Sequence, residues 1–298
     1  MTYSFHLFPP FQPHGTGLKG LVQGTPPPVL PSSGGFIPAA LQICFSHGVD
    51  YAAGAYNCAA SRPMRLPSPT REFPASSLLL NYRPVLSGRI VLPRIGRPVA
   101  EMILKASPAA SRPEPGQPVV LDLEYGPEFY MSVLSVLEDQ GLWRLRLVGG
   151  TGGLSRNVEA KHYGRARAAE VIEDLLAEVG ERVGNVESSV VLPNWLRQEG
   201  LAYQALEALM VNLNKTWRMD NKGLVWVGEE TWPVYAEKVP LAEYYVHQAK
   251  VRLEGLQPCL TPGVELFAHG LGFDGKVGRV ERVIHHFGLE SYTEALCW

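Results

Sequence analysis

The chain has 298 residues, of which 46% are hydrophobic and 19% are charged, and its formal net charge is −2. This composition is typical of a folded protein long enough for two domains and a sizeable core, and it excludes a disordered chain. The balanced charge gives no overall basic excess for nucleic-acid binding, no apolar run is long enough to span a membrane, and the amino terminus lacks the layout of a secretory signal.

Residues 1–80 are rich in proline and glycine, which interrupt any regular element within a few positions. We interpret this part as an amino-terminal arm or a layer built from loops. A poorly ordered tail is an equally weighted alternative for roughly the first thirty residues. Two less interrupted pieces, 36–45 and 49–60, carry enough apolar residues to pack against the body of the protein or a neighbouring chain.

The cysteines are sparse and show no paired CxxC spacing, so buried free thiols are the expectation. The competing hypothesis is a metal site in which Cys44, His47 and Cys58 supply three ligands and Cys259 a distant fourth. Small buried cysteines are common and structural zinc usually shows paired ligand knuckles, which disfavours this site. We expect no other cofactor.

Residues 81–158 are predicted to form a first β unit, because short apolar runs alternate with proline and glycine turns. In its last run, Trp143, Leu145 and Leu147 alternate with two arginines, which gives one core face and one face for water or a partner. Strands at this spacing predict a small barrel or sandwich. The predicted strands are 89–92, 101–104, 119–125, 129–137 and 143–148.

Residues 159–214 are predicted to be a helical connecting segment. Val171, Leu175 and Val179 recur at helical spacing and Gly180 can cap the end, which predicts an amphipathic helix beginning near residue 165. A second helix is predicted over 201–213, where apolar residues again recur at helical spacing.

Residues 215–298 are predicted to form a second β unit. Its first element is a hairpin, because two strand-like runs flank the turn sequence Asp-Asn-Lys-Gly at 220–223. The predicted strands are 215–219, 224–228, 243–251, 264–268, 276–286 and 292–297. The expected fold is therefore mainly β with a helical middle (α+β), in which amphipathic helices join two small β-barrel-like units.

Several stretches carry a resemblance to a known family. They are Gly88-Arg89-Ile90, Gly116-Gln117-Pro118-Val119, the helix 201–213 with the WxxDxxG hairpin at 217–223, and Leu260-Thr261-Pro262-Gly263 followed by 279–286 and 292–296. In order and spacing, residues 85–298 resemble the hub proteins at the tip of phage tails, akin to the late control protein D group and the amino-terminal part of type VI secretion spike proteins.

The resemblance implies a mechanical role. Hubs of this kind are trimers in which two β units of tail-tube type per chain give six near-equivalent positions, so that a six-fold tube can meet a three-fold spike. It implies a homotrimer in the tail baseplate of a virion, assembled in the host cytoplasm. The implied partners are the tail tube or distal tail protein, the central spike protein and other baseplate proteins, with DNA only as passing cargo in the lumen. It implies no catalytic residue.

Three local patterns suggest other chemistry, and each has a simpler interpretation. The glycine run at 149–153 lacks the lysine and serine or threonine of a phosphate loop and the third glycine of a dinucleotide fingerprint, so we expect a flexible exit from the first β unit. Glu229 and Glu230 are neighbours in an extended stretch, as are His285 and His286, so each pair points to opposite faces. We expect solvated or interface carboxylates, and a hydrogen-bonded core histidine at His285.

We therefore predict a structural protein without enzyme activity. The alternative from another class is a carbohydrate-binding or glycan-hydrolase domain built on β barrels, which several carboxylates and an exposed aromatic side chain in one groove would favour. A tail-tip adaptor of the same lineage, working at another ring, is the third possibility.

Overall fold

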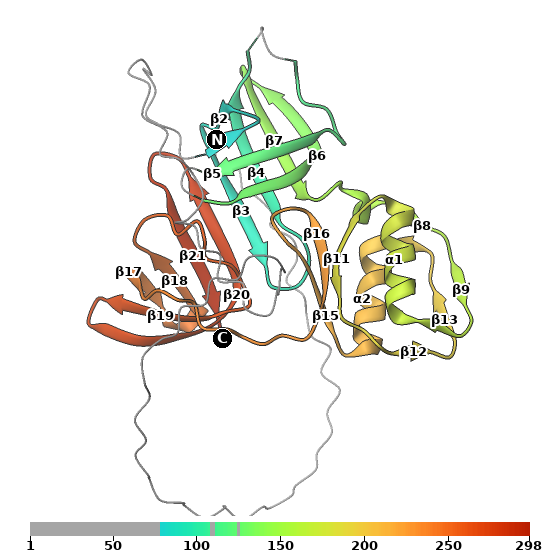
Figure 1. The fold of residues 1–298 in the computed structure, drawn as a ribbon. Coiled ribbons are helices and arrows are strands. Elements are labelled where there is room, and N and C mark those ends of the chain that lie inside the picture. The colour runs from blue at the N-terminus through green and yellow to red at the C-terminus, as the bar shows by residue number, and fades with distance from the viewer. Residues whose placement is uncertain (1–77, 108–110, 124–125) are drawn as a thin grey trace, which may run out of the picture. The chain divides into compact units, whose positions relative to one another are not determined.

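The computed structural model describes residues 78–107, 111–123 and 126–298 (Figure 1). The predicted amino-terminal arm, with its two less interrupted pieces, lies outside these ranges. No helix in the described part of the chain is long and apolar enough to cross a membrane.

The first β unit contains all five predicted strands. Alternation places the buried side chains of these strands, such as Leu145 and Leu147 of β7, on one face. The sequence pattern missed the short strands β1 and β2, whose connecting turn holds Asn81 and Tyr82 at positive φ. The strands are β1 (Leu78–Leu80), β2 (Arg83–Pro84), β3 (Ser87–Pro93), β4 (Val99–Lys105), β5 (Pro118–Leu123), β6 (Glu128–Asp139) and β7 (Leu142–Gly149).

The second β unit is a closed barrel of five strands, because β19 pairs with both β17 and β20. The predicted barrel is thus confirmed for this unit, whereas it stays a prediction for the first. The strand predicted over 243–251 is wrong. The chain reverses there through the short helix η3 (Val246–Gln248) and Ala249 at positive φ, without a glycine or proline to mark the turn. The strands are β17 (Val239–Tyr245), β18 (Lys250–Leu253), β19 (Glu265–Gly270), β20 (Phe273–Phe287) and β21 (Tyr292–Cys297).

Both β units have the same strand order. In the first unit, β3 pairs with β4, β4 with β7, β7 with β6, and β6 with β5. In the second unit, β17 pairs with β18, β18 with β21, β21 with β20, and β20 with β19. Counted from one to five within its unit, each strand therefore has the same neighbours. All these pairings are antiparallel in both units. The difference is the closing pair: β17 pairs with β19 in parallel, and no described pairing joins β3 to β5.

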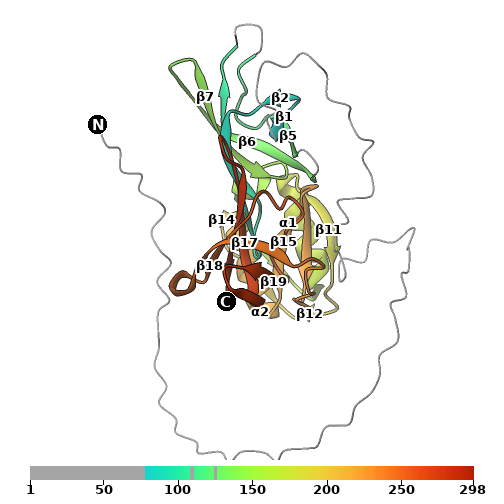
Figure 2. The same ribbon diagram turned by 90° about the vertical axis from the view of Figure 1, so that its left-hand side faces the viewer.

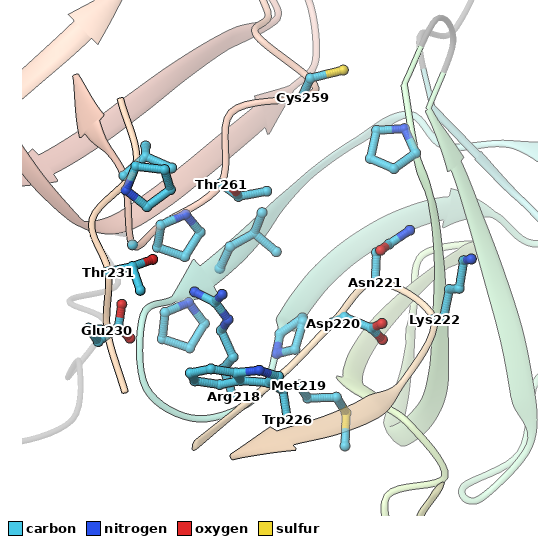
Figure 3. A pocket seen from close by; sticks show the side chains of 18 of the residues that line it. Arg218, Met219, Asp220, Asn221, Lys222, Trp226, Glu230, Thr231, Cys259 and Thr261 are labelled. Atoms are coloured by element: carbon cyan, nitrogen blue, oxygen red, sulfur yellow. The ribbon is translucent and has the colours of Figure 1, made fainter. Parts of the chain in front are cut away.

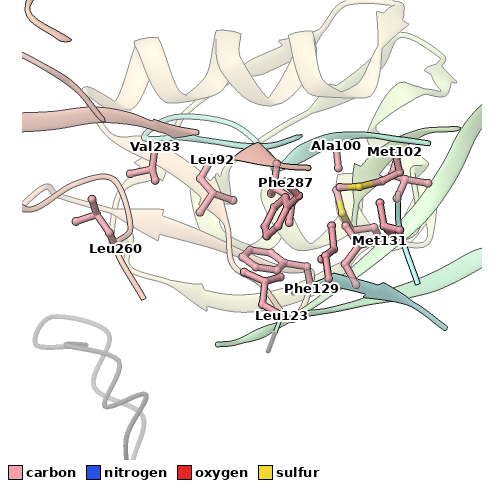
Figure 4. Packing of buried hydrophobic residues seen from close by; sticks show 14 of the residues in the cluster. Leu92, Ala100, Met102, Leu123, Phe129, Met131, Leu260, Val283 and Phe287 are labelled. Atoms are coloured by element: carbon pink, nitrogen blue, oxygen red, sulfur yellow. The ribbon is translucent and has the colours of Figure 1, made fainter. Parts of the chain in front are cut away.

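The two β units pair directly with each other. β20 is 15 residues long, and its second half pairs antiparallel with β3, which produces a continuous sheet of twelve strands (Figure 1). One hydrophobic core spans both units, with Phe129 of β6 packed beside Phe287 of β20 (Figure 4). The predicted helical segment thus connects the units along the chain without separating them, because β20 extends beyond its barrel and pairs with β3.

The helical segment has its own core. Both predicted helices are confirmed, and their buried side chains include Ile172 and Leu176 of the first and Leu206 of the second. They are α1 (Ala168–Val179) and α2 (Ala202–Leu213), accompanied by η2 (Gly153–Ser155), β8 (Asn157–Val158), β9 (Lys161–Tyr163), β10 (Ala166–Arg167), β11 (Arg182–Val186), β12 (Val191–Leu192), β13 (Trp195–Arg197) and β14 (Gly200–Leu201).

The predicted hairpin forms, but in a different place. β15 (Thr216–Met219) and β16 (Leu224–Gly228) pair with each other, and β16 pairs with β11 in a sheet of three strands. The sequence pattern predicts this hairpin as part of the second β unit. Trp217, Met219, Val225 and Val227 instead belong to the core that contains the helices, so burial of these side chains ties the hairpin to the helical segment.

Candidate functional site

A pocket of about 210 Å³ forms where the β15–β16 hairpin faces both β units (Figure 3). The first β unit contributes the end of β3, the loop before β4 and the start of β6. The remaining walls come from Glu187 and from the segments 229–233 and 259–264. Five prolines make much of the lining apolar: Pro93, Pro98, Pro127, Pro233 and Pro262.

An arginine and a tryptophan form one wall of this pocket. Arg218 and Trp226 face each other as a cross-strand pair of the hairpin, and the guanidinium lies 4.7 Å from the centre of the indole ring. Gly263 permits this arrangement, because a Cβ there would lie 2.7 Å from Arg218 Nη1. The indole is only 6% exposed and Arg218 covers one of its faces, so Trp226 offers no open stacking platform.

The neighbouring wall holds a largely buried carboxylate. The side chain of Glu230 is 11% exposed, and its Oε1 lies 3.7 Å from Arg94 Nη1. Burial raises the pKa of the Glu230 carboxyl, against the opposing effect of the nearby Arg218 and Arg94. The protein therefore disfavours the ionised form of this group despite two cationic neighbours.

Three polar atoms of the pocket lining have no hydrogen-bond partner among the described residues. They are Glu230 Oε1, Trp226 Nε1 and Asn221 Oδ1, and each is buried. Buried polar groups are normally paired with protein or with ordered water. These atoms lie in the walls of the pocket with almost no accessible surface, so they are unpaired groups of the packing.

The carboxylates of the lining are engaged separately. Asp220 Oδ1 accepts the Leu224 N–H at 2.8 Å within the hairpin turn, and Glu187 accepts from Asn185 at 2.8 Å. Glu229 is 81% exposed and pairs with a lysine, in contrast to the buried Glu230. The expectation of a solvated carboxylate thus holds for Glu229 and not for Glu230, and both residues line the pocket because they follow the end of β16 at Gly228.

The glycine run at 149–153 is a packed turn, which corrects the expected flexible exit. The N–H groups of Thr151 and Leu154 donate to the carboxylate of Glu181 at 3.0 and 3.3 Å, and Glu181 is buried. A Cβ at Gly153 would collide with the Val179 carbonyl, so glycine allows the turn to meet the end of α1. The amides that a phosphate loop would offer to a ligand are occupied by the protein's own carboxylate.

The two histidines of β20 point to different environments, as the alternation predicts. His285 is fully buried and shares a hydrogen bond of 3.0 Å with Thr293 Oγ1 through Nδ1, and burial lowers its pKa to about 3. Its Nε2 has no partner among the described residues. His286 stacks on Tyr292 and lies 3.2 Å from Glu294 Oε2. His285 is a core residue, with one of its two nitrogens bonded.

Cys44, His47 and Cys58 of the hypothetical metal site lie outside the described residues, so their role remains a prediction, but Cys259 is disulfide-bonded and has no thiolate to act as the fourth ligand. Cys259 lies between β18 and β19 and is disulfide-bonded, whereas Cys297 is a buried free thiol. The expectation of free thiols is thus confirmed for Cys297 and wrong for Cys259. Within the described ranges, no group of three or more His, Cys, Asp and Glu side chains is placed to hold a metal ion.

A cluster of aromatic and cationic side chains was missed by sequence reasoning. The rings of Trp232 and Trp298 meet edge to face at 5.5 Å, and the guanidinium of Arg279 lies 5.1 and 5.5 Å from their centres. Arg94 approaches Trp232 from the first β unit at 5.4 Å. The pairing of β20 with β21 brings Arg279 and Trp298 together, and the pairing of β3 with β20 adds Arg94.

No known family model matches the chain, and none of the curated proteins matches it. Solved structures do share its fold. The 43 kDa tail protein of prophage MuSo2 from Shewanella oneidensis aligns with a TM-score of 0.57 and 7% identity, over 73% of this chain and 95% of its own. The c3393 protein of E. coli, a component of the type VI secretion system, aligns with a TM-score of 0.57 and 13% identity, over 74% and 76%.

A tail protein from Neisseria meningitidis MC58 aligns with a TM-score of 0.53 and 11% identity, over 74% of this chain and 95% of its own. The c3393 protein is itself described as similar in structure to the tail proteins gp27 and gp5 of bacteriophage T4. At these identities the likeness concerns the fold. The chain has the mainly β fold of these tail proteins, in nearly three quarters of its length.

Proposed function

We propose that this chain is a structural protein of a phage tail and acts as the hub of its baseplate. Three copies form a ring with pseudo-six-fold symmetry, which joins the six-fold tail tube to the three-fold central spike. The support is the fold shared with two tail proteins and with a type VI secretion component that resembles T4 tail proteins.

The observation that carries the proposal is the strand order, which occurs twice in the chain. A protein can match six-fold and three-fold neighbours when each chain presents two copies of one interface, since three chains then present six. β3 to β7 and β17 to β21 have the same order and the same antiparallel pairings. This duplication is the feature that a six-to-three adaptor requires.

The proposal sets the partners and the location. The ring contacts the tail tube or distal tail protein on one side and the central spike protein on the other, within a virion baseplate that also holds other proteins. DNA passes through its lumen without specific recognition, which agrees with a formal net charge of −2. The protein has no catalytic role.

Imaging of assembled tails at subunit resolution tests this function. We expect three copies of the chain at the end of the tube, next to the spike. Tails are the appropriate sample, because a hub can require its neighbours in order to associate. A ring with another number of copies, or a position away from the junction of tube and spike, would contradict the hub assignment and favour a different tail-tip adaptor.

The second candidate function is glycan binding or hydrolysis, and the pocket is the observation that favours it. Glu187, Asp220, Glu229 and Glu230 line one cavity with Trp226. Against it, the carboxylates have separate partners and Trp226 is covered by Arg218. Incubation with peptidoglycan and with soluble oligosaccharides is expected to give no cleavage and no binding. Cleavage that disappears in Glu230→Gln would establish the alternative.

A further inference from the structure

The contact between the two β units has a defined form. It joins the fourth strand of the second unit to the first strand of the first unit. Arg282 to Phe287 of β20 pair antiparallel with Pro93 to Gly88 of β3, in an unbroken run. The same edge of β20 is occupied earlier by β19, which ends its pairing at Arg279.

The equivalent edge in the first unit has no strand partner along part of its length in the described ranges. Along β6, β5 pairs as far as Ser132, and the backbone of Gly116 and Gln117 bonds to Val133. Beyond that point no described strand pairs with this edge, although the exposed Arg112 side chain donates to the Val136 carbonyl at 3.3 Å. Both fourth strands shift register against the fifth strand, at Val133/Ser135 in β6 and Val280/Arg282 in β20, so residues 135–139 correspond to 282–286.

The open part of β6 exposes apolar side chains. Leu134 is 49% exposed and Leu137 is 62% exposed, and Figure 2 shows the end of the β6–β7 hairpin projecting from the sheet. An open strand edge with exposed leucines promotes association, and monomeric proteins usually avoid it. This surface is therefore suited to a protein partner.

The complementary surface lies on the second unit. β17 is the equivalent of β3, and it pairs with β19 only through Val239 and Pro240. The rest of that edge, and the turn η3 that follows, have no strand partner among the described residues. Here too apolar side chains are exposed, with Tyr245 at 42% and Val246 at 67%.

We propose that the segment 134–139 of β6 in one copy packs against the segment 244–248 of the next copy, at the end of β17 and in η3. This contact repeats between copies the one that β20 makes with β3 within a copy. The contact between copies rests on the proposed function, because it requires that the copies form a ring. Each copy carries one of each surface, so the contact runs head to tail and ends only when a ring closes.

Photo-cross-linking of the full chain tests this contact. Benzoylphenylalanine replaces Leu137, and equal amounts of unlabelled and nitrogen-15-labelled protein are mixed and assembled into tails. We expect cross-linked peptides that join the tip of β6 in one copy to residues 239–253 in a differently labelled copy. The matched control carries the same group at Val211 of α2, which is exposed and lies outside both surfaces, and is expected not to cross-link to that region.

A charge placed on the open edge gives a second measurement. Leu137→Asp is expected to weaken association at least about tenfold, because a central apolar contact is replaced by a buried charge. Val211→Asp is expected to leave association unchanged. Circular dichroism checks that both variants keep the fold, which the exposure of both side chains favours.

The outcomes separate this contact from the hub assignment. A ring of three whose cross-links map elsewhere would overturn the contact and leave the hub intact. A cross-link between the two segments in a ring of another size would support the contact and overturn the hub. Unchanged association in Leu137→Asp, or copies that do not touch in the tail, would overturn the contact.

Discussion

His285 shows how burial sets the chemistry of a single residue. His285 belongs to β20 and its side chain is fully buried. This burial, aided by the neighbouring His286, lowers its pKa to about 3. In the unfolded chain the pKa is about 6.5, so between these values only the unfolded state binds the proton. Stability contributed by neutral His285 is present above pH 6.5 and is lost as the pH falls, by up to about 1.4 kcal/mol per pH unit.

This linkage makes a testable prediction. Between pH 6.5 and about pH 5, the free energy of unfolding in urea should fall by about 2 kcal/mol on account of this one group. His285→Gln has no proton to take up there, so this part of the fall should be absent in the variant. Equal pH dependence in the two proteins would contradict the assignment of His285 as a neutral buried group.

Glu181 is a second residue whose role depends on its surroundings. Its carboxylate accepts hydrogen bonds from two backbone amides of the glycine turn. Glu181→Ala leaves these donors without an acceptor and should lower the free energy of unfolding by about 3 kcal/mol, whereas Glu181→Gln should recover part of the loss. Glu173→Ala, on the exposed face of α1, is the control and should change little. Wild-type stability of Glu181→Ala in urea would contradict this role.

At the scale of elements, the local periodicity of the sequence predicts the helices. It does not predict which strands pair with one another. α1 follows directly from Val171, Leu175 and Val179, because helix spacing is set within a few residues. The reversal at η3 was missed, since its residues resemble a continuous strand. The sheet to which the β15–β16 hairpin belongs was also missed, because β11 lies on the other side of α2 in the chain.

The placement of the hairpin leads to a prediction for its tryptophans. Trp217 is fully buried in the core of the helical segment, whereas Trp226 lies outside both cores beneath Arg218. Trp217→Ala should therefore cost about 3–5 kcal/mol of stability and Trp226→Ala less, because the flexible Arg218 can partly refill the space. Urea denaturation measures both, with Trp217→Phe as the milder control. A larger loss in Trp226→Ala would place the hairpin differently.

On the scale of the whole molecule, the pocket could not be predicted from the sequence. Its walls come from β3, β6, the β15–β16 hairpin and two connecting segments, which meet only in the folded chain. The sequence predicts solvated or interface carboxylates at Glu229 and Glu230, whereas both line the pocket and Glu230 is largely buried. Glu229 is exposed and Glu230 is largely buried. This difference depends on packing, which the sequence alone does not show.

The molecule contains two hydrophobic cores, and their membership predicts how it opens. The first core includes residues from both β units, and the second joins α1, α2 and the β15–β16 hairpin. Val283 of β20 is fully buried in the first core and pairs with Leu92 of β3. Val283→Ala should therefore reduce the hydrogen-exchange protection of β3 and β4 as well as of β21, because both units depend on the same strand.

Hydrogen exchange read peptide by peptide can separate the two cores. In Val283→Ala the amides of α1 and α2 should keep most of their protection, since their side chains pack in the other core. Leu176→Ala, at a fully buried position of α1, is the reciprocal variant and should expose the helices before the sheets. If Val283→Ala opened β17 to β21 and left β3 to β7 unchanged, the units would be independent domains. β20 would then connect two separately folded units, and the two units would not share one hydrophobic core.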